Sequence, residues 1–315
     1  MRKMIILGTG LAMATRCFNT CFYLELEDNS LFLTDAGGGN GILRQLEITG
    51  FDYQRCHHMF VTHGHTDHVL GVIWVIRKVA DLMNKGKYGG QFHIYCHDVV
   101  KDMLLAMTQM TLKKKDFARV GTDIVLHELQ DGESVDLQQF RLTAFDILST
   151  KAKQFGYCLQ FADGMKFTCL GDEPYNEHDR QYAEQADWLL AEAFCQYKDR
   201  EVFKPYEKNH STVKEASELA SVLGVKNLVL YHTEDKHLAA RKAEYTAEAQ
   251  QYYQGNVFVR DTFYNSIFKH VRERTVPDVV HEDSRLYGFR FTVENEVSLG
   301  GKLLDSFTHK VECPQ

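Results

Sequence analysis

Short runs of apolar residues, many of them β-branched or aromatic, recur along the chain. Runs of roughly four to eight such residues, bounded by polar or glycine-containing segments, are typical of β-strands. We therefore expect strands at 3–8, 21–27, 31–37, 59–63, 92–97, 140–148, 155–162, 165–172, 187–194, 227–232 and 257–261.

Between these runs, apolar positions recur with the spacing of amphipathic helices. Helices are expected at 39–50, 70–86, 98–110, 177–186, 211–224 and 241–253. The helix at 211–224 has clear ends, because Thr212 and Glu215 form a capping-box pattern and Gly224 follows the last apolar position. Strands in pairs, followed by strands that alternate with helices, predict a layered α/β protein with helix-covered sheets.

Residues suited to chemistry stand at the ends of several predicted strands. His63 follows "MFVT", Asp172 follows "MKFTCLG", Glu192 ends "WLLAE", and His232 follows "NLVLY". Rigid strands commonly hold functional groups in the loops that follow them. The repeated placement favours one functional site built from distant parts of the chain.

Composition and charge restrict the class of protein. The 315 residues are 44% hydrophobic and 25% charged, as in ordinary globular domains, and the net charge of −7 argues against wholesale wrapping of nucleic acid. A local basic groove is compatible with a negative net charge for the whole chain, but we interpret Lys113, Lys114 and Lys115 as a solvated surface turn.

Cellular location is inferred from the cysteines and from the lengths of the apolar runs. None of the eight cysteines forms a C-x-x-C pair, and a reduced, cytoplasmic protein explains them more simply than a disulfide framework. The unbroken apolar run near the start spans only Met4 to Leu7, which is too short for a signal peptide. No run approaches the length of a membrane span.

The segment "FVTHGHTDHVLG" carries the densest set of metal ligands in the chain. His63, His65, Asp67 and His68 fall within six positions, directly after a predicted strand. These donors suit Zn²⁺, Mn²⁺ or Fe²⁺, and two ions about 3.5–4 Å apart could clamp both oxygens of a displacement. We therefore predict a centre that binds one or two metal ions.

The same residues resemble the signature of a known fold. "THGHTDH" is similar to the motif of the metallo-β-lactamase fold, a four-layer αββα sandwich of metal-dependent hydrolases. Within that group the chain resembles ribonuclease Z and its relatives over roughly residues 3 to 262. The matching segments are "LGTGLAMATRCFNTCFYLE", "LTDAGGG", "FGY" at 155–157, "GD" at 171–172, "AEAF" at 191–194, "NHST" at 209–212 and "LVLYHT" at 228–233.

The resemblance implies a role for each matching residue. The first metal would be held by His63 and His65, the second by Asp67, His68 and His232, and Asp172 would bridge them. His210 would donate a proton to the leaving oxygen, and Glu192 would be its acidic partner. Asp35 would brace the loops beneath the metals.

A phosphate site is expected beside His210, which directly precedes the capped N-terminus of the helix expected at 211–224, because a helix N-terminus attracts anions. Lys151 is a further candidate for contact with an anionic substrate group. We therefore name Lys151, Ser211 and Thr212 as substrate-binding candidates.

Three departures from the ribonuclease Z pattern bear on metal and substrate. The position of an expected histidine ligand, six residues before Gly156, holds Thr150, and no histidine occurs between His127 and His178. Asp146, Ser149, Lys151 or water are the other groups that could fill this space. Only fourteen residues separate Tyr157 from Asp172, which leaves no room for a tRNA-gripping arm. The segment "AEAF" has Ala191 where the family has histidine.

The leading hypothesis is a metal-dependent phosphodiesterase, with zinc as the expected metal, that uses a metal-bound hydroxide held by Asp67 and acts on a substrate smaller than tRNA, such as a cyclic or modified nucleotide. Its substrate would be a phosphodiester or nucleotide, with RNA as an option, although tRNA 3′ processing is disfavoured. An ester, thioester or lactone hydrolase of the same fold, and a non-catalytic metal-binding protein, remain alternatives.

The chain exceeds the family pattern at its C-terminal end. We predict a hydrolase domain at 1–271 and an extension at 272–315. Alternating apolar residues from Tyr287 to Val293, followed by Gly300 and Gly301, are typical of a β-hairpin. Such a hairpin must bury its apolar face, so we expect it to cover the site or to form a homodimer.

Overall fold

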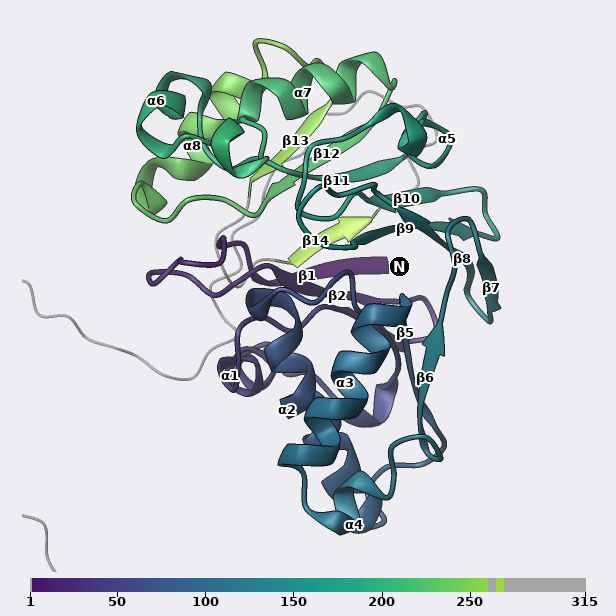
Figure 1. Ribbon diagram of the computed structural model, residues 1–315. Coiled ribbons are helices and arrows are strands. Elements are labelled where there is room, and N and C mark those ends of the chain that lie inside the picture. The colour runs from purple at the N-terminus through teal and green to yellow at the C-terminus, as the bar shows by residue number, and fades with distance from the viewer. Residues whose placement is uncertain (1, 260–264, 269–315) are drawn as a thin grey trace, which may run out of the picture. The chain divides into compact units, whose positions relative to one another are not determined.

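Two β-sheets lie face to face, and helices cover their outer surfaces (Figure 1). The computed structural model describes residues 2–259 and 265–268. The first sheet has the strand order β14-β1-β2-β3-β4-β5-β6 and the second the order β13-β12-β11-β10-β9-β8-β7. This arrangement confirms the predicted αββα sandwich. The predicted hairpin at 272–315 lies outside the described residues, and the domain boundary at 271 stays a prediction.

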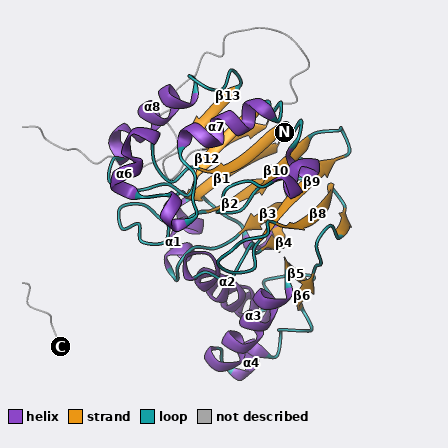
Figure 2. Cartoon of the chain, turned by 45° about the horizontal axis from the view of Figure 1, so that its top comes forward, coloured by secondary structure: helices purple, strands orange, loops and turns teal. Residues whose placement is uncertain are grey.

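Each sheet combines an antiparallel half with a parallel half. Strands β1, β2 and β3 are antiparallel neighbours, whereas β3, β4, β5 and β6 run parallel. In the second sheet β7 to β10 are antiparallel, and β10 to β13 are parallel. Figure 2 shows the helices distributed around this strand framework. The strands are β1 (Arg2–Gly8), β2 (Cys21–Glu25), β3 (Leu31–Thr34), β4 (Cys56–Phe60), β5 (Phe92–Cys96), β6 (Ile124–Glu128), β7 (Ser134–Leu137), β8 (Phe140–Asp146), β9 (Phe155–Phe161), β10 (Lys166–Cys169), β11 (Trp188–Glu192), β12 (Asn227–Tyr231), β13 (Asn256–Val259) and β14 (Asn265–Phe268).

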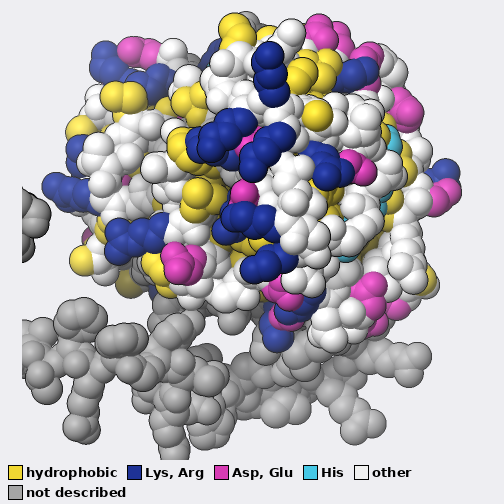
Figure 3. All heavy atoms as spheres, turned by 90° about the horizontal axis from the view of Figure 1, so that it is seen from below, with side chains coloured by type: hydrophobic (Ala, Val, Ile, Leu, Met, Phe, Trp, Pro, Cys, Tyr) yellow, Lys and Arg dark blue, Asp and Glu magenta, His cyan; other side chains and the backbone are white. Residues whose placement is uncertain are grey.

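Five of the six predicted helices are present, although the helix expected at 70–86 begins at Thr66, and the single turns Lys114–Phe117 and Arg200–Phe203 were not predicted. The helix expected at 177–186 is a short 3-10 turn (Glu177–Asp179) followed by the single turn α5. The helices are α1 (Gly41–Ile48), α2 (Thr66–Asn84), α3 (Asp98–Thr111), α4 (Lys114–Phe117), α5 (Arg180–Ala183), α6 (Arg200–Phe203), α7 (Val213–Val222) and α8 (Leu238–Ala249). The lysines at 113–115, expected in a turn, lie at and within α4, on a face rich in Lys and Arg (Figure 3).

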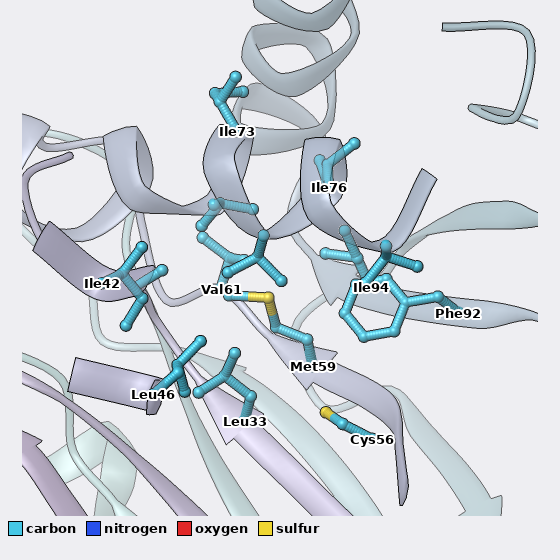
Figure 4. Packing of buried hydrophobic residues seen from close by; sticks show 14 of the residues in the cluster. Leu33, Ile42, Leu46, Cys56, Met59, Val61, Ile73, Ile76, Phe92 and Ile94 are labelled. Atoms are coloured by element: carbon cyan, nitrogen blue, oxygen red, sulfur yellow. The ribbon is translucent and has the colours of Figure 1, made fainter. Parts of the chain in front are cut away.

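Three apolar layers hold the sandwich together. The central layer lies between the sheets and includes Phe22, Phe32, Tyr157 and Phe167. A second layer packs α1, α2 and α3 on the first sheet; it includes Ile42, Leu46, Ile73 and Ile76 of the helices and Leu33, Met59 and Ile94 of the strands (Figure 4). A third layer packs α5, α7 and α8 on the second sheet. Burial of these layers is the main favourable term in folding, and it fixes the strand ends that carry the site.

Candidate metal centre

The loop between β4 and α2 carries the metal-ligand motif. His63 follows β4, His65 is the residue before α2, and Asp67 and His68 lie in the first turn of that helix. The helix approaches the loop after β3 so closely that a Cβ at Gly71 would come within 1.8 Å of the Ala36 carbonyl oxygen. Because the close packing fixes the start of α2, it also fixes the direction of Asp67 and His68.

Three further residues reach the same place from the second sheet. Asp172 follows β10, Glu192 ends β11, and His232 follows β12. Strands β10, β11 and β12 are parallel neighbours, so their carboxyl ends meet at one edge of the sheet. His232 has a left-handed backbone (φ 53°), an uncommon conformation for a non-glycine residue that often occurs at functional sites.

The structure brings all six predicted metal ligands together in two clusters. One consists of His63, His65 and Asp172, and the other of Asp67, His68 and His232. Within each cluster the candidate ligand atoms lie within 4.8 Å of one another. The roles of these residues as ligands stay predictions, but their convergence is the arrangement that metal binding requires.

The spacing of the atoms fits metal coordination better than direct hydrogen bonding. Asp172 Oδ2 lies 3.5 Å from His63 Nε2, 3.6 Å from His68 Nε2 and 3.4 Å from His232 Nε2. Two atoms bound tetrahedrally to one zinc ion, each about 2.1 Å from it, are about 3.4 Å apart. Among the described residues, these three buried nitrogens and Asp67 Oδ2 have no hydrogen-bond partner. Buried polar atoms are normally satisfied, so the donor set fits a divalent metal.

Asp35 orients the Asp67/His68/His232 cluster from beneath. Its carboxylate lies 2.8 Å from His68 Nδ1 and accepts hydrogen bonds from the Thr62 backbone N–H (2.8 Å) and hydroxyl (2.7 Å). Metal-binding histidines commonly place their second nitrogen against a carboxylate in this way. Burial disfavours a charged His68, but the Asp35 and Asp67 carboxylates raise its pKa well above the ordinary value.

The predicted proton donor lies beside the metal ligands. The His210 ring centroid is 5.2 Å from that of His232, and His210 Nδ1 is 3.6 Å from Glu192 Oε2. Burial, with help from the Lys151 ammonium, lowers the pKa of His210 to about 4. Burial raises the pKa of Glu192 to about 8, although its carboxylate accepts a hydrogen bond from the Ser211 N–H. His210 and Glu192 thus lie close enough to act as a pair.

Two of the predicted substrate-binding residues have structural roles at the start of α7. The Thr212 hydroxyl and backbone N–H both engage Glu215, which confirms the capping box. The Ser211 hydroxyl donates a hydrogen bond to the Glu192 carbonyl oxygen (3.1 Å). Both residues are buried, and their contact with substrate stays a prediction.

The segment that contains Thr150 is held by a carboxylate that the sequence pattern does not single out. Glu173 is buried and accepts hydrogen bonds from the Ser149 hydroxyl (2.7 Å), the Gln154 amide (3.2 Å) and the Asn209 amide (2.6 Å). Lys151 Nζ lies 3.6 Å from the same residue. Glu173 directly follows Asp172 in the sequence, and that adjacency is the one signal that could have indicated its role.

A cleft of about 620 Å³ opens beside the two clusters. The predicted ligands His65, Asp67, Asp172 and His232 line it, together with His210 and Lys151. The remaining walls combine lysines, acidic residues and apolar side chains: Leu11, Ala12, Met13, Gly64, Thr66, Phe194, Phe203, Lys208, Glu234, Asp235 and Lys236. The cleft can therefore take a ligand that has both an anionic group and an apolar part.

The chain is similar to several known proteins. It is 25% identical over 294 residues to the ribonuclease Z of Thermococcus sibiricus, with 80% of this chain and 91% of the relative covered. The solved structure of human tRNase Z, short form, superposes with a TM-score of 0.65 at 22% identity, covering 84% of this chain and 98% of that one. A diphosphatase of the PhnP family superposes with a TM-score of 0.65 at 15% identity, covering 85% and 98%.

These likenesses confirm the metallo-β-lactamase fold and the predicted likeness to ribonuclease Z. Among the described residues, no helix has both the length and the apolar character needed to cross a bilayer. The model of one family, described as "Anti-Pycsar protein Apyc1", matches residues 2–258, which is most of the chain. The chain therefore belongs to the Apyc1 family of proteins with the metallo-β-lactamase fold.

Proposed function

We propose that the protein is a metal-dependent hydrolase that cleaves small phosphodiesters, with a cyclic or modified nucleotide as the substrate class. The observation that carries this proposal is the convergence of three histidine nitrogens on Asp172 Oδ2, at 3.4–3.6 Å. One carboxylate shared by two ligand clusters is the arrangement expected of a two-metal centre, as in many enzymes that displace oxygen at phosphorus. The similarity to proteins named ribonuclease Z supports the same chemistry.

The metal is proposed to be Zn²⁺, because imidazole nitrogens outnumber carboxylates in the site and suit zinc. His63, His65 and Asp172 would hold one ion, and Asp67, His68, His232 and the shared Asp172 the other. When bound, such ions lower the pKa of water and neutralise the charge that develops on phosphoryl oxygens. Mn²⁺ or Fe²⁺ would fit the same donors.

The chain's own residues bind and orient the anionic substrate. Lys151 and Lys208 line the cleft, and their ammonium groups attract a phosphate. His210 Nδ1 lies 3.6 Å from Glu192 Oε2, and the His210 ring is proposed to deliver a proton to the leaving oxygen. A bound phosphodiester favours the protonated imidazole, because its negative charge lies beside the ring. Asp67, beyond its role as a ligand, can orient the attacking water.

The shape of the site favours a small substrate. Strands β9 and β10 form a tight antiparallel hairpin with four residues between Phe161 and Lys166, so the arm that would grip tRNA is missing there. A cleft of about 620 Å³ can enclose a nucleotide. Phe194 and Phe203 in its wall offer apolar surface for a base. Among the alternatives, the lysines of the cleft favour an anionic diester over a neutral ester or lactone.

The proposal is tested with paired chromogenic substrates and then with nucleotides. We expect hydrolysis of bis(p-nitrophenyl) phosphate, strong dependence on added Zn²⁺, and little activity on p-nitrophenyl acetate. Cyclic mononucleotides should be cleaved faster than an RNA oligomer. Asp67→Asn should abolish activity, whereas Asp136→Asn, at an exposed position, should not. Preferential hydrolysis of the acetate would move the assignment to an esterase, and metal binding without any turnover would indicate a binding protein.

Two further expectations belong to this proposal. A cytoplasmic location is supported by the seven cysteines in the described part of the chain, all of which are free thiols.

A homodimer is proposed on the sequence of the C-terminal extension alone, and light scattering of the full chain tests it. A monomeric mass at working concentration would contradict it.

A further inference from the structure

A basic face lies on the outer side of the helical layer, away from the residues that line the metal cleft. It consists of Arg77 and Lys78 on α2, Lys85 and Lys87 after α2, and Lys113, Lys114 and Lys115 at α4. All seven side chains belong to exposed residues. Figure 3, which views the protein from below, shows Lys and Arg side chains gathered across the face that it presents. The face unites two chain segments that are far apart in sequence.

Most of the cations on this face lack acidic partners. Within the described residues, Lys85 forms an ion pair with Asp81 (2.6 Å), and the remaining six have no carboxylate within the 4.0 Å ion-pair distance. Asp81 and Asp116 are the acidic residues that line the groove across this face, against the four cations Arg77, Lys78, Lys113 and Lys115. Lys85, Lys115 and Lys78 all lower the pKa of Asp81. The whole chain has a net charge of −7, so the local charge of this face has the opposite sign to the net charge of the protein. Uncompensated cations at short range repel one another, and a bound anion relieves that repulsion.

A groove of about 300 Å³ runs through the basic face and contains an aromatic ring. Trp74 lines it beside Arg77, Lys78, Lys113 and Lys115. The Arg77 guanidinium lies 5.3 Å from the Trp74 ring centroid, and Trp74 is half-buried against the core of α1 to α3. A second ring, Tyr53, has Lys78 Nζ at 5.8 Å from its centroid. The groove therefore combines cations for phosphates with a planar surface for a base.

We propose that the basic face binds single-stranded nucleic acid at a site distinct from the metal cleft. Lys78, Lys113 and Lys115 contact backbone phosphates, and a base stacks at Trp74 with Arg77 beside it. Aromatic rings within a cationic groove are the common basis of single-strand binding without sequence preference. An anionic membrane is a poorer match, because Trp74 is half-buried in the wall of the groove and packs against the core. The groove and the cleft share no lining residue.

The test measures binding of a labelled, non-cleavable 2′-O-methyl oligonucleotide of roughly twelve nucleotides by fluorescence anisotropy. The holoprotein is titrated at NaCl concentrations from about 25 to 200 mM. The test variant replaces Lys78, Lys113 and Lys115 with Gln. Its matched control replaces Arg141, Lys198 and Lys226 with Gln, which removes equal charge from exposed positions elsewhere. A third variant, Trp74→Leu, keeps apolar packing and removes the stacking surface.

The expected results separate phosphate contacts from stacking. The Lys78/Lys113/Lys115 variant should bind at least about tenfold more weakly at low salt, and the slope of log K against log [NaCl] should become shallower by about 2, or about 0.7 for each phosphate that is no longer neutralised. The control triple should bind within about twofold of the parent with an unchanged slope. Trp74→Leu should weaken binding about fivefold without a change in slope. Circular dichroism confirms that each variant is folded.

Several outcomes would overturn the proposal. Equal losses in the two triple variants would mean that binding follows overall charge rather than this face. Undiminished binding by the test variant, or displacement of the oligonucleotide by bis(p-nitrophenyl) phosphate, would place the strand in the metal cleft. Binding to phosphatidylserine vesicles, with none to the oligonucleotide at low salt, would assign the face to membranes.

Discussion

The two ligand clusters of the metal centre differ in how completely the protein surrounds them. Asp67, His68 and His232 are all buried, and Asp35 fixes the ring of His68 from behind. In the other cluster His65 is only half-buried and borders the cleft. The position where the ribonuclease Z pattern has a further histidine holds Thr150, whose hydroxyl accepts a hydrogen bond from the Asn209 amide (3.3 Å).

Because of this difference, we expect the two clusters to bind metal ions with unequal affinity. Buried ligands with fixed orientation lose little conformational freedom on binding, and supporting carboxylates strengthen the histidines they contact. In the His63/His65/Asp172 cluster His65 is only half-buried, and Lys151 lines the same cleft. We therefore expect the Asp67/His68/His232 cluster to bind zinc more tightly.

Replacing Asp172 should have the largest effect, because its Oδ2 lies near histidines of both clusters. Asp172→Ala should reduce bound zinc from two equivalents to fewer than one, and phosphodiesterase activity by about a thousandfold or more, since loss of a metal removes several kcal/mol of transition-state stabilisation. Elemental mass spectrometry and the bis(p-nitrophenyl) phosphate assay measure the two effects. Retention of two equivalents would show that Asp172 is not shared.

Asp35→Asn should weaken zinc binding more in the Asp67/His68/His232 cluster than in the His63/His65/Asp172 cluster. The amide keeps the size of the side chain but cannot balance the charge of the neighbouring imidazole, so His68 loses its support. Loss of such a supporting carboxylate typically costs about ten- to a hundredfold in metal affinity. Calorimetric titration should show a lower zinc affinity in the tighter of the two binding steps. Equal weakening of both steps would contradict the assignment of Asp35 to the buried cluster.

Thr150→His should have a smaller, opposite effect by supplying a ligand to the weaker cluster. We expect the weaker zinc step to tighten by about tenfold, because another imidazole would complete the tetrahedral set. Thr122→His, at an exposed turn between α4 and β6, adds a histidine far from the site and controls for non-specific zinc binding. If Thr150→His leaves both affinities unchanged, the Thr150 position does not face the metal.

A substitution outside both clusters should not alter the ratio of their two zinc affinities. Glu215→Ala removes the capping box at the start of α7 and should lower the free energy of unfolding by about 1 kcal/mol. Urea denaturation of the metal-depleted protein measures this loss. The ratio of the two zinc affinities should not change, and a changed ratio would mean that α7 positions His210 and the clusters together.

The local features of the site can be predicted from the sequence, whereas its long-range contacts cannot. The ligands between His63 and His68 are adjacent in the chain, and the strands before them have clear apolar patterns. Asp172 and His232 stand out because each follows a buried strand. Glu173, in contrast, contacts Ser149, Gln154 and Asn209, and no periodic pattern records such contacts.

The elements that the sequence pattern does not predict have a similar explanation. Strands β6 and β7 lie at sheet edges, and their partly exposed residues lack the continuous apolar runs of the central strands. The lysines at 113–115, taken alone, are typical of an isolated solvated turn. Packing of α2 beside α4 places Arg77 and Lys78 next to them, and only the folded chain reveals the combined surface.

The most direct test is a zinc titration of metal-depleted protein, with calorimetry and hydrolysis of bis(p-nitrophenyl) phosphate followed on the same sample. We expect two equivalents of zinc to bind in resolved steps, with full activity reached only as the second step is completed. In the His232→Ala variant the tighter step should disappear. A single equivalent in the parent protein, or hydrolysis that does not depend on zinc, would contradict a two-metal phosphodiesterase.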